Sequence, residues 1–332
     1  MTGFVPYQEL AGIPNIIVDG SAAGGTLITL SHWPHSGTPT PLKDDLSTQI
    51  VFRYLKAPEF HVEAAAVSNN HFDEDGLAGL YAILHPEDAL ALEPLLVDVA
   101  AAGDFGTYRF PEAARAVFVL SAFADPDLSP FGGALFARPY PEVTVLLYRE
   151  TLPRLPEILR ESDRFRDFWI FEQDLLDASE KAIRSGEITI RELPLLDLAV
   201  VELPEALPGR SVHRFTQKRH AACHPMALHN ATHCFRVLLV QGRCYELQYR
   251  YESWVQHISR RPLPRVDLEP LALRLTEQEK NGGRWEFDGV GEITPRLRLA
   301  GAEESAIPPD LFLRQVADYL ETAPPAWDPY DP

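Results

Sequence analysis

The stretch that decides the fold reads VEAAAVSNNHFDEDGLAGLYAIL over residues 62–84. Its first seven residues are mostly small and apolar, which predicts a buried strand over 62–68. The residues from Gly76 to Leu84 predict a helix that Pro86 terminates. A run of polar residues therefore occupies the turn between a strand and a helix.

Outward from this stretch, runs that read as strands alternate with runs that read as helices. The predicted strands cover residues 15–19 and 26–31, and the predicted helices cover 46–55, 87–102 and 111–123. Such alternation is typical of a mainly parallel sheet with helices packed on its faces. We therefore predict an α/β fold, in which ligands bind beyond the carboxyl ends of the strands.

The pattern changes after residue 130. Segment 142–148 reads as a strand, and 150–184 is charged and helical. Further strands are predicted at 187–192, 196–202, 234–240 and 243–250, and a helix at 266–279. The second half should therefore form a smaller C-terminal α+β domain. The predicted divisions are an α/β domain over 1–130, a helical connection over 131–190, a substrate domain over 191–322 and an irregular tail over 323–332.

Composition narrows the classes of function. The chain has 332 residues, of which 45% are hydrophobic, and a formal net charge of -18. Negative charge repels the phosphate backbone, which disfavours binding of long duplex nucleic acid. The cysteines Cys223, Cys234 and Cys244 fit neither a disulfide framework nor a zinc ribbon. Because no apolar run approaches the ~20 residues that span a bilayer and no secretory signal is visible, we expect a cytoplasmic protein without a membrane partner.

Three side chains of the polar turn have metal-binding chemistry. His71, Asp73 and Asp75 alternate with other residues, so an extended turn can aim all three into one cleft. One imidazole and two carboxylates suit Mn²⁺ or Mg²⁺. In the alternative interpretation, Asp73 and Asp75 only cap the following helix. Capping accounts for one acid, but not for a histidine and two acids at i, i+2 and i+4.

Further candidate ligands stand at the ends of other predicted elements. Asp19 and His32 lie at the carboxyl ends of the two N-terminal strands, and Asp104 follows a predicted helix. Each has an ordinary alternative. Asp19 can form a simple turn with Gly20, Asp104 can cap a turn, and His32 can be a buried core histidine. Their shared position favours a common site with His71.

These motifs resemble those of the DHH phosphoesterase superfamily, which includes RecJ-type exonucleases, oligoribonucleases and family II pyrophosphatases. The segment from His71 to Leu77 is similar to the first superfamily motif, His-x-Asp-x-Asp-Gly-Leu after an apolar strand. Three other motifs have counterparts in Val18-Asp19-Gly20, in LSHWPHSGT over residues 30–38 and in VAAAGDFG over 99–106. These are similar, in that order, to the bridging aspartate, the Asp-His-His motif and the helix-end aspartate.

The resemblance implies a centre with two Mn²⁺ or Mg²⁺ ions. The implied ligands are His71, Asp73 and Asp19 for one ion, and Asp75, Asp19, His32 and Asp104 for the other. Ions about 3.5–4 Å apart would activate a bridging hydroxide and hold the phosphoryl oxygens. Asp19, as the shared ligand, would be catalytic.

The chain departs from the superfamily pattern in two ways. Its His-x-Asp-x-Asp motif follows the motifs around Asp19 and His32, as in a circular permutation. Ser31 and Trp33 also replace the outer residues of Asp-His-His. Because the second histidine is missing from its place, we predict that His35 supplies the catalytic imidazole that binds the phosphoryl group.

The resemblance extends faintly to a C-terminal substrate domain with a Gly-Gly-Gly-His loop and a basic anchor for phosphate. The candidates for these parts are Arg250, Gly282, Gly283 and Arg284. Arginine gives bidentate contacts to phosphate, and a glycine loop lets backbone N–H groups approach an anion. In the alternative interpretation, these arginines only form ion pairs with surface acids, which are abundant in this acidic chain.

A stretch rich in histidine and cysteine lies before this loop, over residues 220–234. Its spacings match no standard zinc site. We interpret it as a substrate-facing or structural loop, in which Asn230 and His233 are further candidates for substrate contact.

These features predict a divalent-metal-dependent phosphoesterase acting on a small phosphate-containing anion, such as a short oligonucleotide, a nucleotide or a polyphosphate. Two other functions stay open. One is a non-catalytic protein that keeps the fold and binds a nucleotide or metal as a sensor, which the altered Asp-His-His element favours. The other is a metallohydrolase acting on non-phosphate bonds, for which a single tetrahedral zinc would be diagnostic. The oligomeric state is not predicted.

Overall fold

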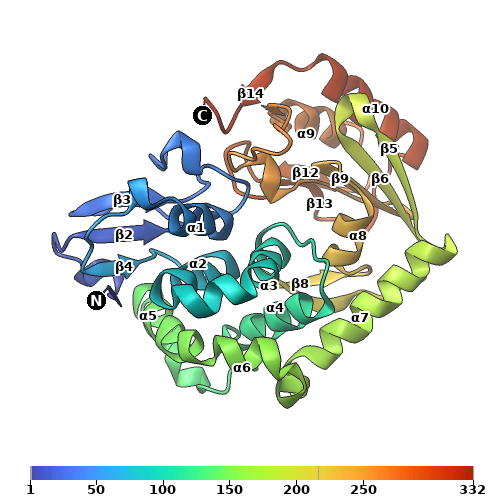
Figure 1. Ribbon diagram of the computed structural model, residues 1–332. Helices are drawn as coiled ribbons and strands as arrows, with labels where there is room; N and C mark the ends of the chain where they lie inside the picture. The colour runs from blue at the N-terminus through green and yellow to red at the C-terminus, as the bar shows by residue number, and fades with distance from the viewer. Residues whose placement is uncertain (1, 216, 332) are drawn as a thin grey trace. The chain divides into compact units, whose positions relative to one another are not determined.

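The computed structural model describes residues 2–215 and 217–331. Over these residues the chain divides into two compact units, whose segments can be followed by colour in Figure 1. The first unit consists of Met1–Leu176, Arg210–Ala221 and His257–Ser259, and the second of Asp177–Gly209, Ala222–Gln256 and Arg260–Pro332. The first unit therefore includes a hairpin and a short segment from the second half of the sequence.

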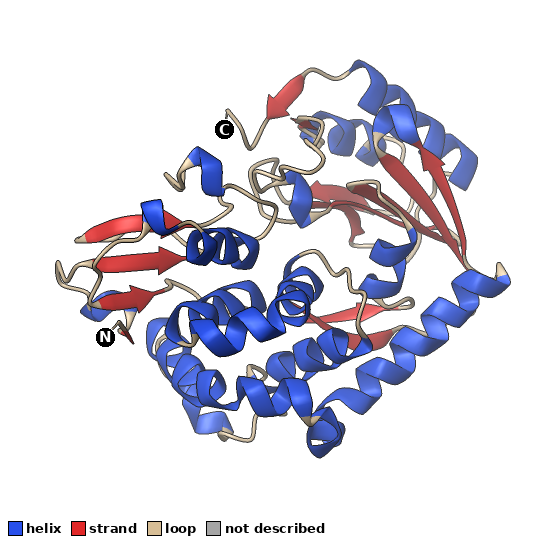
Figure 2. Cartoon of the chain, viewed as in Figure 1, coloured by secondary structure: helices blue, strands red, loops and turns tan. Residues whose placement is uncertain are grey.

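A small parallel sheet organises the first unit. Its strand order is β1 (Gly3–Phe4), β4 (Ala66–Ser68), β2 (Asn15–Val18) and β3 (Thr26–Leu30). Neighbouring strands are parallel, with Ile16 opposite both Val67 and Ile28, and the arrows of β2 and β4 point the same way in Figure 2. Every residue of β2 is buried, as expected of an inner strand of a parallel sheet. The predicted α/β class is confirmed.

Helices follow the strands as the sequence predicts. They are α1 (Ser47–Lys56), α2 (Glu74–Leu84), α3 (Pro86–Asp104) and α4 (Pro111–Phe123). Along the chain, α2 packs against α1 and α3, and α3 packs against α4. Proline stands at the start of α3 and α4, where its missing N–H is not needed. The strand β4 is shorter than predicted, because the chain becomes buried only from Ala66 onward.

One predicted strand is wrong. Residues 142–148 belong to the helix α5 (Tyr140–Thr151). Val143, Leu147 and Thr151 are buried on one side at a spacing of four residues, which is the period of a helix and not of a strand. The charged region that follows is helical, as predicted, with α6 (Leu155–Arg160) and α7 (Arg166–Ser185).

The second unit contains a mixed sheet. Its strand order is β12 (Arg284–Phe287), β13 (Arg296–Ala300), β10 (Cys244–Tyr249), β9 (Arg236–Gln241), β6 (Leu198–Leu203) and β5 (Thr189–Leu193). The pair β6–β9 is parallel, and the other pairs are antiparallel. Side chains of α9 (Glu269–Thr276) and α10 (Pro309–Thr322) join its core, where Phe312 stacks on Tyr245 and Trp285. This agrees with the predicted C-terminal α+β region.

Several elements differ from the sequence prediction. The helix expected over 266–279 is shortened to α9, and the tail expected to be irregular contains β14 (Pro325–Trp327), which pairs with β11 (Arg265–Val266). The hairpin β7 (Arg210–Arg214) and β8 (Gln217–Ala221) and the helix α8 (Pro225–Ala231) were not predicted. Within the described part of the chain, no helix is long and apolar enough to cross a membrane.

Candidate metal centre

The candidate ligands stand where elements of the first unit end. Asp19 directly follows β2, and its φ of 48° lies in the left-handed region that non-glycine residues seldom adopt. His32 lies two residues beyond β3, and Asp104 is the last residue of α3. His71 belongs to the turn between β4 and α2. Asp19, His32 and His71 thus follow the carboxyl ends of parallel strands, where α/β sheets bind their ligands, and Asp104 joins them from a helix end.

Two groups of potential ligands result, which we call the inner group and the outer group. The inner group consists of Asp19, His32, Asp75 and Asp104, and the outer group of Asp19, His71 and Asp73. In each group the ligand atoms lie within 4.8 Å of one another. The inner side chains are at most 1% exposed, whereas His71 is 21% and Asp73 12% exposed. The structure therefore brings together the two sets that the motif resemblance implied, while their role as ligands stays a prediction.

His32 lies at the centre of the inner group. Its Nε2 is 3.5 Å from Asp19 Oδ1, 3.5 Å from Asp104 Oδ2 and 4.0 Å from Asp75 Oδ2. Octahedral coordination with bonds of about 2.1 Å separates neighbouring ligands by about 3 Å and opposite ligands by about 4.2 Å. The three separations lie between these two values, so the group has room for one small divalent ion among its ligand atoms.

The second nitrogen of His32 is already engaged. Nδ1 lies 2.6 Å from the main-chain carbonyl oxygen of Asp45, which can only accept a hydrogen bond. The Nδ1 atom therefore carries a proton, which leaves Nε2 as the nitrogen that can bind a metal. Metal-binding histidines are commonly oriented by such a carbonyl group.

Asp19 faces both groups. Its Oδ1 accepts a hydrogen bond of 2.6 Å from Ser47 Oγ and lies 3.5 Å from His32 Nε2. Its Oδ2 lies 3.3 Å from His71 Nε2, which is also 2.6 Å from Asp73 Oδ2. A carboxylate with one oxygen beside each group has the geometry of a ligand that bridges two ions.

The carboxylates of the two groups repel one another. Burial and the charges of Asp75, Asp73 and Asp19 raise the pKa of Asp104 well above its usual value. Burial and the charge of Asp19 likewise raise the pKa of Asp75. Burial disfavours the charged form of His71, yet the carboxylates of Asp73 and Asp19 raise its pKa well above the ordinary value. The centre concentrates negative charge that a divalent cation would neutralise.

Several polar atoms of the centre lack hydrogen-bond partners among the described residues. They are both carboxylate oxygens of Asp104, Oδ2 of Asp19 and Nδ1 of His71. A buried polar group without a partner costs about 1–3 kcal/mol, so native proteins keep few of them. Bound cations would satisfy the carboxylate oxygens. The oxygen-rich donor set with imidazole nitrogen fits Mn²⁺ or Mg²⁺ better than a metal that prefers thiolates.

Helix capping explains part of this arrangement. Asp73 caps α2, because its Oδ1 accepts a hydrogen bond of 2.8 Å from the backbone of that helix. Asp75 receives the N-terminus of α1, since Ser47 N donates to its Oδ2 at 2.8 Å and Thr48 N to its Oδ1 at 2.7 Å. Capping does not account for the carboxylate of Asp104, which has no N–H partner in the described chain.

Two glycines let the ligand turn pack closely. A Cβ at Gly76 would lie 2.1 Å from Asn69 Nδ2 and 2.8 Å from the hydroxyl of Tyr148. A Cβ at Gly20 would lie 2.1 Å from Oδ1 of Asn70, which belongs to the same turn. Tyr148 is buried on α5, and its hydroxyl donates a hydrogen bond of 2.8 Å to the carbonyl oxygen of His71. The backbone of the turn is thereby held from both sides.

A model of one protein family matches the chain over residues 1–331. The chain belongs to the family of unknown function DUF6687. No curated protein and no solved structure matches it. The DUF6687 match carries no link to the DHH superfamily.

The DUF6687 centre is supported by residues that sequence reasoning did not identify. They are Asp45, Ser47, Thr48, Glu74 and Tyr148. Ser47 and Thr48 begin a predicted helix, and the free N–H groups of a helix start are known partners of carboxylates, so this signal was visible. Glu74 is buried beside the ligands, and burial together with the charge of Asp73 raises the pKa of Glu74 to about 7.

The segment of the DUF6687 chain that resembles Asp-His-His contributes only one ligand to the groups. Trp33 stacks on His71, with ring centroids 5.1 Å apart and an interplanar angle of 29°. His35 is exposed in a turn at a φ of 56° and belongs to neither ligand group. The catalytic role of His35 stays a prediction.

The predicted substrate-binding residues belong to the second unit. Arg250 is buried, and its guanidinium donates to the carbonyl oxygen of Thr232 at 3.0 Å and to the carboxylate of Glu252. Arg284 is 71% exposed and pairs with Glu286. Asn230 lies in α8, His233 follows that helix, and Gly282 and Gly283 precede β12. The contacts of Arg250 are those of a structural arginine, and the substrate role of the whole set stays a prediction.

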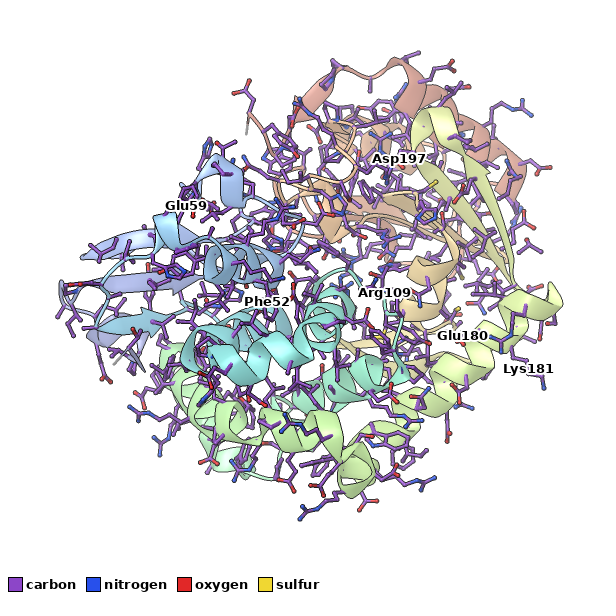
Figure 3. The ribbon with its side chains drawn as sticks, viewed as in Figure 1. Phe52, Glu59, Arg109, Glu180, Lys181 and Asp197 are labelled. Carbon is purple, nitrogen blue, oxygen red and sulfur yellow. The ribbon has the colours of Figure 1, made fainter. Side chains whose placement is uncertain are left out.

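A hollow of about 390 Å³ lies between α1 and α3, apart from the centre. Phe52 and Arg109, labelled in Figure 3, are among its lining residues. Its charges are paired, since Lys56 Nζ lies 2.6 Å from both carboxylate oxygens of Glu93. None of the inner or outer ligands is among the described residues that line it, so we assign it no part in the chemistry of this DUF6687 protein.

Proposed function

We propose that this protein is a divalent-metal-dependent phosphoesterase that hydrolyses a small phosphate ester or anhydride. The observation that carries the proposal is the position of Asp19, which has one oxygen beside the inner group and the other beside the outer group. Paired metal sites are typical of phosphatases and nucleases that displace a phosphoryl substituent. The resemblance of the ligand motifs to those of DHH phosphoesterases supports the same reaction class.

The two groups would hold two Mn²⁺ or Mg²⁺ ions, with Asp19 shared between them. Such ions, when bound, lower the pKa of coordinated water and neutralise charge on phosphoryl oxygens. The burial of the inner group favours a resident ion. The partial exposure of His71 and Asp73 leaves the outer side accessible to a substrate.

The chain's own residues prepare this site. The Ser47 hydroxyl holds Asp19 Oδ1, and the carbonyl group of Asp45 holds the His32 ring with Nε2 toward the carboxylates. Stacking of Trp33 limits the access of water to one face of His71. The net charge of -18 favours a small anion, neutralised at the centre, over a long nucleic acid.

A second function, binding of a nucleotide or metal without catalysis, is favoured by Trp33. This residue stands where the DHH pattern has its second histidine, and it stacks on His71. Among the described residues, the ligand groups contain no imidazole besides His32 and His71. On this alternative, the centre binds its ions but has no group free to assist the phosphoryl transfer.

Hydrolysis of bis(p-nitrophenyl) phosphate and of pyrophosphate tests the proposal. We expect activity of the full chain with Mn²⁺, its loss with EDTA, and its loss in Asp73→Ala together with part of the bound metal. The matched control is Glu63→Gln, because Glu63 is exposed on the segment before β4. Bound Mn²⁺ without hydrolysis would favour the binding function. An absence of hydrolysis with unchanged metal content in Asp73→Ala would reject the enzyme.

A further inference from the structure

A buried arginine from the hairpin β7–β8 contacts the helix that ends in Asp104. Arg214 is the last residue of β7 and is 9% exposed. Its two terminal nitrogens donate hydrogen bonds to the main-chain carbonyl oxygens of Gly103 and Asp104. Carbonyl groups in the last turn of a helix have no partner within the helix. Arg214 therefore caps α3 at the candidate ligand.

We propose that Arg214 is a positioning residue of the metal centre, which holds the inner ligand Asp104 by its backbone. The inference rests on the proposed metal-dependent function. Two donors of one rigid guanidinium on neighbouring carbonyl groups fix both the position and the orientation of the helix end. The carboxylate of Asp104 has no hydrogen bond within the described chain that could fix it instead. Its place beside His32 therefore depends on its backbone.

The charge of Arg214 also suits this place. The C-terminal end of a helix carries partial negative charge, which a cation stabilises. The guanidinium also opposes the rise in the pKa of Asp104 and of Glu74 that burial causes. Glu74 packs directly on α3, because a Cβ at Gly103 would lie 2.6 Å from Glu74 Cβ. The positive charge of Arg214 thus offsets part of the negative charge of Glu74 and Asp104.

The neighbours of Arg214 in the hairpin hold it in turn. Its guanidinium carbon lies 3.7 Å from the ring centroid of Phe215, whose φ of 49° is left-handed. His213 is held between two acids, with Nε2 2.7 Å from Asp125 Oδ2 and Nδ1 bound to the carboxylate of Glu172. The hairpin is therefore anchored beside α4 and α7, and its last strand residue is directed at the end of α3.

Titration of the metal-free full chain with Mn²⁺, followed by calorimetry, tests the inference. Asp104→Asn and Asp73→Asn identify the inner and the outer binding event, because each removes a ligand of one group. Replacement of residues that orient metal ligands commonly weakens metal binding by about 10- to 100-fold. We therefore expect Arg214→Gln to weaken the inner event by about that factor and to leave the outer event unchanged. The matched control is Arg210→Gln, at an exposed position of the same strand, which should bind as the unsubstituted chain does.

A conservative variant separates positioning from folding. Arg214→Lys keeps the charge but cannot donate to both carbonyl groups in the planar arrangement of arginine. A weakened inner event in Arg214→Lys, at an unchanged melting temperature, supports the inference even where Arg214→Gln does not fold. If either folded variant binds Mn²⁺ at the inner group with unchanged affinity, the inference about Arg214 is overturned, while the proposed function stands. An absence of Mn²⁺ binding in the unsubstituted chain would overturn the proposed function and this inference with it.

Discussion

The Oδ2 atom of Asp104, at the end of α3, lies 3.5 Å from Nε2 of His32, just beyond β3. Both side chains are at most 1% exposed. Neither carboxylate oxygen of Asp104 has a hydrogen-bond partner in the described chain. Without a cation, this buried carboxylate costs stability, whereas on the proposed function a bound cation would take it as a ligand. The same contact therefore predicts opposite effects of substitution with and without metal.

Asp104→Asn is expected to remove the stabilisation by metal. In EDTA, the free energy of unfolding of the variant should equal that of the unsubstituted chain or be higher by up to about 1 kcal/mol. The reason is that the substitution removes a buried charge that has no hydrogen-bond partner. At Mn²⁺ concentrations about 100 times the dissociation constant, each occupied site adds about 2.7 kcal/mol. The variant should lack this gain at the inner group. Urea unfolding in EDTA and in Mn²⁺ measures both values.

Asp98→Asn is the matched control on the same helix. Asp98 is also buried, but its carboxylate accepts hydrogen bonds from Arg109 N at 2.8 Å and Phe110 N at 2.7 Å. This variant should be destabilised in both solutions. Equal destabilisation of Asp104→Asn in EDTA would contradict the interpretation of Asp104 as a ligand kept for a cation.

Ser47→Ala is expected to weaken metal binding through Asp19. The substitution removes the hydrogen bond of 2.6 Å that holds Asp19 Oδ1. We expect a loss of about 10-fold in Mn²⁺ affinity, since partners of metal ligands commonly contribute at least this much. Thr151→Val serves as control, because the buried Thr151 hydroxyl of α5 donates to the main-chain carbonyl oxygen of Leu147 and contacts none of the candidate ligands. Equal Mn²⁺ affinities of the two variants would argue against a specific role of Ser47.

Gly76→Ala is expected to destabilise the ligand turn. The new Cβ would lie 2.1 Å from Asn69 Nδ2 and 2.9 Å from Asp73 Oδ1, so side chains of the turn have to move. Overpacking of this kind costs about 1–3 kcal/mol, and displacement of the turn should also weaken Mn²⁺ binding at the outer group. Gly3→Ala, in β1, should change neither quantity, because a Cβ there meets nothing within 4 Å. A thermal melt and a Mn²⁺ titration of both variants check this prediction.

The hairpin should make the free energy of unfolding depend on pH through His213. Burial lowers the pKa of this histidine, but hydrogen bonds and charges of Glu172 and Asp125 outweigh it, and the pKa is raised above its usual value. Charged His213 therefore stabilises the fold fully below about pH 6.5, the unfolded pKa. This contribution is lost as the pH rises through the higher folded pKa. Urea unfolding on both sides of neutrality should show a decline that His213→Gln lacks.

His220→Gln provides the control for that decline. His220 is exposed on β8 of the same hairpin and has no carboxylate partner among the described residues. Its removal should leave the pH dependence of the unfolding free energy as it is. If His213→Gln and His220→Gln change that dependence equally, the buried pair with Glu172 is not its source.

The part of the fold that holds the candidate metal centre was predictable because it depends on local patterns. Apolar runs that end in polar turns define β2, β3 and β4, and such turns place Asp19, His32 and His71 at one edge of a parallel sheet. Helical spacing likewise predicted α3 and the position of Asp104 at its end. The strand predicted at 142–148 is wrong because β-branched and aromatic residues favour strands locally, whereas tertiary packing buries this segment at helical spacing.

The supporting contacts of Arg214 and Asp45 were not predictable, because they join segments far apart in the sequence. Arg214 reaches the end of α3 from a hairpin in the second half of the chain, and Asp45 accepts hydrogen bonds from Ile258 N and Ser259 N. Neither position has a local pattern that distinguishes it from surface charge. Arg250 illustrates the opposite difficulty. The sequence predicts it as a phosphate anchor, but in the structure its guanidinium donates to a main-chain carbonyl group.

Anomalous scattering from Mn²⁺ in crystals of the full chain tests the central claim most directly. The account predicts two manganese peaks, one among His32, Asp75 and Asp104 and one beside His71 and Asp73, with an oxygen of Asp19 bound to each. Each ion should be bound mainly by oxygen, in six-coordinate geometry. A single tetrahedral site, or manganese that leaves Asp19 uncoordinated, would contradict the claim that Asp19 bridges two ions.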